Sequence, residues 1–122
     1  MTVRAICIAL AAGFATMAAP ALAHPKLLLS TPAAGGSAQN VKQISLKFSE
    51  GLVGPVSGGG LSMKMGEHIM DVSGLKTTIA KDGKTLVATL EKPLPAGQYV
   101  FDWHVVSTDT HRVAGKLAFT VK

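Results

Sequence analysis

Cysteine is almost absent from this chain: Cys7 is the only cysteine among its 122 residues. Cys7 lies in the apolar N-terminal segment that we expect to be removed, so the mature chain would contain no thiol. A chain without cysteine forms no disulfide and no thiolate metal site. Blue copper centres, zinc ribbons and thioredoxin-type redox chemistry are therefore excluded.

Charge of one sign is not concentrated anywhere in the chain. It has 12 Lys and Arg against 7 Asp and Glu, but its lysines are scattered from Lys26 to Lys122. No basic block alternates with aromatic residues, as it would in a nucleic-acid-binding surface. We therefore expect a solvated basic surface and no nucleic-acid partner. Nucleophile elbows, phosphate loops and paired catalytic carboxylates are also missing, so we do not expect an enzyme.

The chain also lacks an uninterrupted apolar run of the roughly 20 residues that a transmembrane helix needs. Its N-terminal segment instead has the three parts of a secretory signal peptide. Arg4 is followed by an apolar run over residues 5–12, and Ala21-Leu22-Ala23 places small residues at the positions that a signal peptidase reads. We predict cleavage after Ala23, which makes residues 1–23 the signal peptide and residues 24–122 the mature domain. The mature protein is then expected in the periplasm, without a membrane span of its own.

Helical periodicity is missing after Ala23, and short alternating strands take its place. Asp82-Gly83 predicts a hairpin turn between segments 77–80 and 85–90, and residues 51–60 have the glycine-rich composition of a loop. About a hundred residues are enough for one hydrophobic core and too few for two. We therefore predict an all-β, single-domain antiparallel β-sandwich. The other predicted strands are residues 44–48, 61–65, 99–106 and 117–121.

The segment 99–106 carries half of the aromatic residues, and its alternation predicts which of its side chains are buried. Tyr99 follows Pro95-Ala96-Gly97 at the start of a strand, the position of the corner tyrosine in immunoglobulin-like sandwiches. Trp103 shares its face with Phe101 and is predicted to lie in the core. His104 points to the opposite face and is interpreted as a surface histidine.

His24 would become the first residue of the mature chain and would then carry a free α-amino group beside its imidazole. These two nitrogens can close a chelate ring on one metal ion, and the amine is easily deprotonated because its reference pKa is about 8. Pro25 has no backbone N–H, so the metal cannot recruit the next amide nitrogen. The chelate therefore stops at two nitrogens and needs further ligands from elsewhere in the fold.

Asp109-Thr110-His111 can supply those ligands. In an extended segment, residues two apart point to the same side, so Asp109 and His111 would converge on one ion. With His24 they give three nitrogens and one oxygen, a set that suits tetragonal Cu(II). Taken alone, the Asp-x-His pattern is more often a local hydrogen-bonded pair. Its combination with a terminal histidine favours the metal site.

A second candidate cluster combines three methionines with one histidine: Met63, Met65, His68 and Met70. Thioethers are soft ligands that favour Cu(I), and imidazole binds both oxidation states. Methionine is also a common filler of hydrophobic cores, so core packing is the alternative interpretation. We expect the cluster to lie near an exposed glycine-rich loop, where core filler is less expected.

These residues, taken together, resemble the CopC (PcoC-like) family of periplasmic copper-resistance proteins over the whole mature length. The stretches that carry the resemblance are His24-Pro25-Lys26-Leu27, Ser30-Thr31-Pro32-Ala33, Lys47-Phe48-Ser49-Glu50, Pro95-Ala96-Gly97-Gln98-Tyr99, Asp102-Trp103 and Val106-Ser107-Thr108-Asp109-Thr110-His111.

The resemblance implies a Greek-key β-sandwich or barrel of the immunoglobulin-like or cupredoxin-like kind, and a protein that carries or buffers copper for resistance or homeostasis. It implies a Cu(II) site at His24, Asp109 and His111, and it makes the Met63–Met70 segment a shortened form of the family's methionine-rich Cu(I) loop. It also implies a separate inner-membrane copper transporter (CopD-like) as the partner.

Two other classes of function remain open on the sequence. A terminal-histidine copper site also occurs in polysaccharide monooxygenases, but those enzymes are larger and present a flat aromatic surface, whereas the only tryptophan here is predicted to be buried. A sandwich of this size can also serve in adhesion or protein interaction without any metal.

Overall fold

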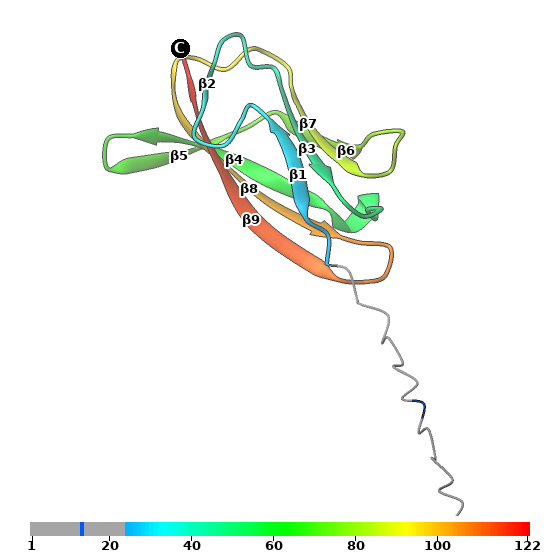
Figure 1. Ribbon diagram of the computed structural model, residues 1–122. Helices are drawn as coiled ribbons and strands as arrows, with labels where there is room; N and C mark the ends of the chain where they lie inside the picture. Colours follow the sequence, from blue (N-terminus) through cyan, green and yellow to red (C-terminus); the bar gives the residue numbers. More distant parts are fainter. Residues whose placement is uncertain (1–12, 14–23) are drawn as a thin grey trace, which may run out of the picture.

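A computed structural model of the protein describes residue 13 and residues 24–122. Apart from Gly13, the predicted signal peptide lies outside the described residues, and the predicted cleavage is not part of what they show. Residues 24–122 form two facing β-sheets (Figure 1). One sheet has the strand order β1 (Leu27–Thr31), β3 (Gln43–Phe48), β7 (Thr85–Leu90), β6 (Leu75–Ile79). The other has the order β2 (Ser37–Ala38), β9 (Arg112–Val121), β8 (Gly97–Val106), β4 (Gly58–Met65), β5 (His68–Val72).

The predicted antiparallel sandwich is confirmed. Neighbouring strands run antiparallel except for the short pair of β2 and β9, which is parallel. The chain crosses to the second sheet for the short strand β2 and returns at β3, and it crosses again between β3 and β4, between β5 and β6, and between β7 and β8, as in a Greek-key sandwich. The only helical turn among the described residues is a short 3₁₀ segment, η1 (Gly54–Val56).

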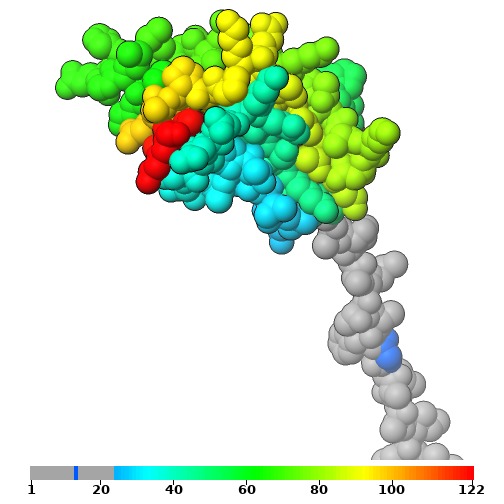
Figure 2. All heavy atoms as spheres, turned by 90° about the horizontal axis from the view of Figure 1, so that it is seen from above, coloured from blue at the N-terminus to red at the C-terminus, as the bar shows by residue number. Residues whose placement is uncertain are grey.

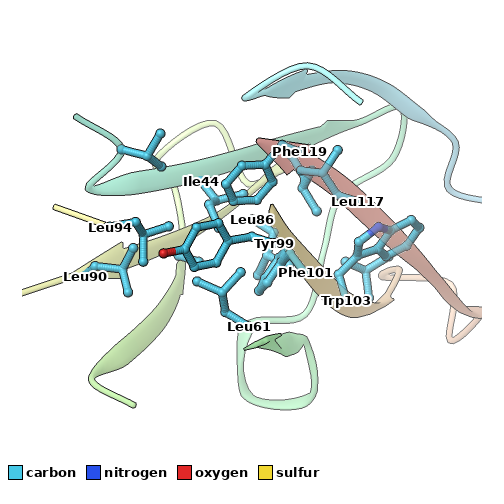
Figure 3. Close-up of a cluster of buried hydrophobic side chains, with 14 of the residues drawn as sticks. Ile44, Leu61, Leu86, Leu90, Leu94, Tyr99, Phe101, Trp103, Leu117 and Phe119 are labelled. Atoms are coloured by element: carbon cyan, nitrogen blue, oxygen red, sulfur yellow. The ribbon is translucent and has the colours of Figure 1, made fainter. Parts of the chain in front are cut away.

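The core lies between the sheets and follows the predicted alternation of β8. Tyr99, Phe101 and Trp103 are buried and point into the sandwich from this strand (Figure 3). The Trp103 ring meets Phe48 of the opposite sheet edge-on, with 5.1 Å between ring centroids. Tyr99 stacks on Phe119 of the neighbouring strand at 5.6 Å. Both pairings are favourable aromatic arrangements, and the burial of Trp103 is confirmed.

The corner-tyrosine prediction is also confirmed. The Tyr99 hydroxyl donates a hydrogen bond of 2.7 Å to the carbonyl oxygen of Pro95, four residues upstream. Burial raises the pKa of Tyr99, so its hydroxyl remains a proton donor. The bond ties the loop that follows β7 to the start of β8.

The hairpin predicted at Asp82-Gly83 joins β6 and β7. Gly83 has a φ of 71°, a left-handed conformation that glycine adopts without strain. The Asp82 carboxylate accepts hydrogen bonds from the hydroxyl of Thr85 at 2.7 Å and from the backbone N–H of Lys84 at 2.9 Å. These contacts, the Thr85 hydroxyl first, lower the pKa of Asp82 and close the turn.

The prediction of a loop over residues 51–60 is wrong for its last three residues. Gly58, Gly59 and Gly60 are paired with β8 as the first part of β4. A β-carbon on Gly59 would lie 2.5 Å from the backbone oxygen of Asp102 and 2.7 Å from the ring of Phe101. Glycine therefore marks a close approach of two strands here, a case that composition alone does not distinguish from a loop.

Candidate metal centre

The turn between β8 and β9 holds two of the predicted ligands. The backbone N–H of Ser107 bonds the carbonyl of His111 at 2.9 Å, and that of Thr110 bonds the carbonyl of Ser107 at 2.8 Å. Thr110 has a φ of 75°, in the left-handed region. The expectation of an extended segment is therefore wrong: tight turn geometry, rather than strand alternation, brings Asp109 and His111 together.

Asp109 is held by its neighbours in this turn. Its Oδ1 accepts hydrogen bonds from the buried hydroxyl of Ser107 and from the backbone N–H of His111, the latter at 3.3 Å. The imidazole Nδ1 of His111 lies 3.2 Å from the same oxygen. The hydrogen bond from Ser107 is the main reason that the pKa of Asp109 is lowered. The carboxylate is therefore ionised, as a metal ligand must be.

His24 lies beside this turn although it comes from the other end of the described chain. Its ring meets that of His111 edge-on, with 4.7 Å between centroids. Pro25 is buried, and the backbone of Lys26 exchanges two hydrogen bonds of 2.9 Å with Ser49, through the Ser49 hydroxyl and backbone N–H. The burial of Pro25 and these two hydrogen bonds position the segment that carries His24.

Ser107 and Glu50 are two residues of this region that sequence reasoning missed. Ser107 stands two residues before Asp109 in a Ser-x-Asp-x-His alternation, a pattern that could have pointed to it. Glu50 is half-buried, and both of its chain neighbours contact this region. Ser49 is hydrogen-bonded to Lys26 of the His24 segment, and the carbonyl of Gly51 accepts a hydrogen bond of 2.9 Å from the backbone N–H of Thr108. The fold thus adds a carboxylate to the end of the sandwich where the histidines meet.

The three predicted ligands are neighbours, but their donor atoms do not converge on one point. Among the described residues, no group of three or more His, Cys, Asp or Glu side chains has the geometry of a metal site. Nδ1 of His111 is nevertheless a buried nitrogen with no hydrogen-bond partner in the described part of the chain, because its approach to Asp109 is poorly aligned. An unpartnered buried nitrogen beside an ionised carboxylate and a second imidazole is a donor set that suits a divalent ion of the Cu(II) type. The backbone nitrogen of His24 is an amide in the uncleaved chain and would become an amine only after the predicted cleavage at Ala23.

The methionine cluster lies on the β4–β5 hairpin, and the glycines of the loop expected beside it, Gly58 to Gly60, are themselves part of β4. Met63 is directly opposite Met70, and Met65 is directly opposite His68. Residues that face each other across antiparallel strands, and residues two apart on one strand, share a face of the sheet. The register therefore places all four predicted ligands on one face of the hairpin.

That face is buried at one end and open at the other. Met63 packs against the core, whereas Met65 and Met70 are 48% and 54% exposed and His68 is exposed. The hairpin extends beyond the rest of the sandwich, at the end away from β1 and the β8–β9 turn (Figure 1). Core packing accounts for Met63 but not for the other three residues.

In the part of the chain that the structure describes, no helix is both long enough and apolar enough to cross a bilayer.

Comparison with protein families finds that the model of the CopC domain matches residues 27–122. The chain is 42% identical to copper resistance protein C of Pseudomonas syringae pv. tomato over 109 residues, covering 87% of this chain and 86% of the relative. It is 41% identical to copper resistance protein C of Xanthomonas campestris pv. juglandis over 108 residues, with 85% and 84% covered.

Among solved structures, the chain is similar to PcoC, a methionine-rich copper resistance protein from Escherichia coli. The TM-score is 0.75 at 42% identity, covering 82% of this chain and 100% of PcoC. It is also similar to CopC from Methylosinus trichosporium OB3b, with a TM-score of 0.68 at 26% identity and with 81% and 94% covered.

Proposed function

Since the chain belongs to the CopC family, we propose that it is a periplasmic copper-binding protein that carries or buffers copper for resistance or homeostasis. The observation that carries this proposal is the contact between His24 and His111, with 4.7 Å between their rings. These two imidazoles are far apart in the sequence, and the fold brings them together at one end of the sandwich. The matched relatives are named for copper resistance, which supports copper as the cargo.

The proposed Cu(II) site consists of the imidazole and α-amine of His24, the carboxylate of Asp109 and the imidazole of His111. Cleavage after Ala23 creates the amine, so processing in the periplasm would complete the site. Small rotations of the two imidazoles, which are half-buried or exposed, would turn their nitrogens from each other and from Asp109 toward one ion. Glu50 supplies a further carboxylate at the same end of the sandwich.

The proposed Cu(I) site consists of Met63, Met65, His68 and Met70 on one face of the β4–β5 hairpin. Sulfur and imidazole ligands suit Cu(I). The two proposed sites lie at different ends of the sandwich, so each oxidation state would be bound by its own set of ligands. The exposed hairpin face would let an acceptor reach the Cu(I) ion, and a separate inner-membrane copper transporter would be that acceptor.

A binding role is favoured over catalysis on glycans. The aromatic residues among residues 24–122 are all buried, so this part of the chain offers no flat aromatic surface for a polysaccharide.

The experiment that tests the Cu(II) site compares two chains, one beginning at His24 and one beginning at Ala23. Competition titration with a Cu(II) chelator should give much weaker binding for the longer chain, because its His24 nitrogen is a peptide nitrogen. Electron paramagnetic resonance should show three nitrogen ligands for the shorter chain. Equal affinities for the two chains would contradict the terminal chelate.

The Cu(I) site is tested separately with His68→Ala, which should weaken Cu(I) binding and leave the Cu(II) titration unchanged. His104→Ala is the matched control, because His104 is a half-buried histidine on β8 outside both proposed ligand sets. Loss of binding for both oxidation states in the His68 variant would mean that the two clusters do not act as separate sites.

A further inference from the structure

The edge strand β1 exposes three consecutive leucines. Leu27, Leu28 and Leu29 are 38%, 60% and 63% exposed, on a strand that has β3 on one side and, among the described residues, no strand on the other. Edge strands of soluble proteins are usually protected by charged residues or proline, and β1 contains neither. A run of large exposed apolar side chains is typical of a surface that binds a protein or a membrane.

The leucines do not form one flat face. The register of β1 and β3 shifts between Leu27 and Leu29, so Leu28 is the extra residue of a bulge. Leu27 is paired with Phe48, whose side chain points into the core, and Leu29 is paired with the exposed Lys47. The leucines therefore project in different directions from the edge. A flat protein surface would contact only the leucines on one side of this edge. An apolar layer that the edge enters would contact the leucines on all sides.

The strands of the same sheet carry charge of one sign. The four strands β1, β3, β7 and β6 contain two charged residues, Lys47 and Lys76, and both are exposed. Asp82, an acidic residue in the turn between β6 and β7, lies near Lys47. Lys26, directly before the leucines, is exposed as well. The other exposed apolar region, at the tip of the β4–β5 hairpin, differs because Lys64 is accompanied there by Glu67 and Asp71.

We propose that the β1 edge docks on the surface of an anionic lipid bilayer, with Leu28 and Leu29 in the boundary between headgroups and acyl chains. Lys26 and Lys47 would lie against the lipid phosphates, to which cationic side chains near a membrane surface are attracted. Apolar side chains combined with flanking lysines are the usual basis of such interfacial binding. In Figure 2 the atoms of β1, in blue, form part of the outer surface of the molecule.

Docking in this way would bring the copper site to the membrane. His24 precedes Leu27 by three residues, so an edge held at the bilayer holds the histidines beside it. That consequence rests on the proposed copper function, whereas the docking itself does not depend on it.

The test measures binding of the chain cleaved after Ala23, which contains both sheets and the whole core, to vesicles by flotation. Vesicles of phosphatidylglycerol and phosphatidylethanolamine should bind the protein at low salt, and vesicles of phosphatidylcholine should bind it at least about tenfold more weakly because they lack net charge. Leu28→Ser with Leu29→Ser should weaken binding to the anionic vesicles by about tenfold or more. Ile69→Ser is the matched control, because Ile69 of the hairpin is even more exposed, at 72%. Its binding should remain within about twofold of the unchanged protein.

Three results would overturn the proposal: no binding of the unchanged protein to anionic vesicles, undiminished binding of the double leucine variant, or an equal loss in the Ile69 variant. A concentration-dependent dimer that disappears in the leucine variant, without vesicle binding, would assign the edge to a second copy of the chain instead. The copper titration of the leucine variant should be unchanged, so failure of membrane docking and failure of the copper site are distinguishable.

Discussion

Replacing Ser107 with alanine should weaken Cu(II) binding without removing a ligand. The Ser107 hydroxyl is buried and donates a hydrogen bond to Oδ1 of Asp109. The carboxylate's other contacts, to the backbone N–H and the Nδ1 of His111, are longer, at 3.3 and 3.2 Å. Copper bound to the His111 imidazole would also compete with the contact between Nδ1 of His111 and the Asp109 carboxylate. Ser107 is therefore the main group that keeps the carboxylate in position in the loaded protein.

The expected loss follows from the role of a side chain that orients a ligand. Removing such a side chain typically costs about 10- to 100-fold in metal affinity, which corresponds to about 1.4–2.8 kcal/mol. Ser107 also lowers the pKa of Asp109 below its ordinary value of 3.8. An ordinary aspartate is still ionised at pH 7, so the loss at that pH reports the position of the carboxylate and not its charge.

The assay is a Cu(II) competition titration at pH 7 on the chain that begins at His24. Thr108→Ala is the control, because it removes an exposed hydroxyl from the same turn, and it should bind within about twofold of the unchanged protein. Asp109→Ala should lose more than Ser107→Ala, since it removes the ligand itself. If Ser107→Ala binds Cu(II) as tightly as the unchanged protein while Asp109→Ala is impaired, the Ser107 hydroxyl does not position the carboxylate, and the prediction is refuted.

Three further predictions concern stability and can be checked by denaturant or thermal unfolding. Gly59→Ala should destabilise the fold by about 1–3 kcal/mol through overpacking, whereas Gly60→Ala, whose added carbon meets open space, should be neutral or slightly stabilising; equal effects would contradict the close approach at Gly59. Tyr99→Phe should cost about 0.5–1.5 kcal/mol, the value of its hydrogen bond, and an unchanged urea midpoint would show that the corner is not stabilising. Because the pKa of Asp82 is lowered in the folded state, its carboxylate stabilises the fold above about pH 3.8 and this contribution is lost as the pH falls further. The stability difference between the unchanged protein and Asp82→Asn should therefore be present at pH 6 and shrink below pH 3.8; a difference independent of pH would contradict the role of its charge.

Strand alternation was enough to predict the sandwich and most of its core. Ile44, Tyr99, Phe101 and Trp103 are buried because they alternate with polar residues along strands with one face on the core. The edge strands β1, β2 and β5 could not be predicted in this way. Their side chains are mostly exposed on both faces, so the sequence has no period of two to detect.

The candidate site was predictable in its residue types but not in its geometry. The chemistry of His24, Asp109 and His111 pointed to one metal, and the fold brings these residues together at one end of the sandwich. The turn that joins Asp109 to His111, and the support from Ser107, depend on backbone hydrogen bonds between β8 and β9. Backbone bonds leave no pattern in residue spacing, so the sequence alone suggested an extended segment at Asp109 and His111, and only the Ser-x-Asp-x-His spacing could have pointed to Ser107.

The hydrogen bonds between Lys26 and Ser49, and between Thr108 and Gly51, have a consequence for the time at which copper can be loaded. His24 and His111 become neighbours only after β1 has joined β3 and after the β8–β9 turn has docked on Gly51, which is far from Thr108 in the sequence. Such long-range pairings form late, because closing a long loop costs chain entropy before any contact repays it. A partly exported chain would therefore present scattered donors without a site. Binding of Cu(II) would begin only once the domain has folded. Folded molecules would therefore bind the metal, and incompletely folded ones would not.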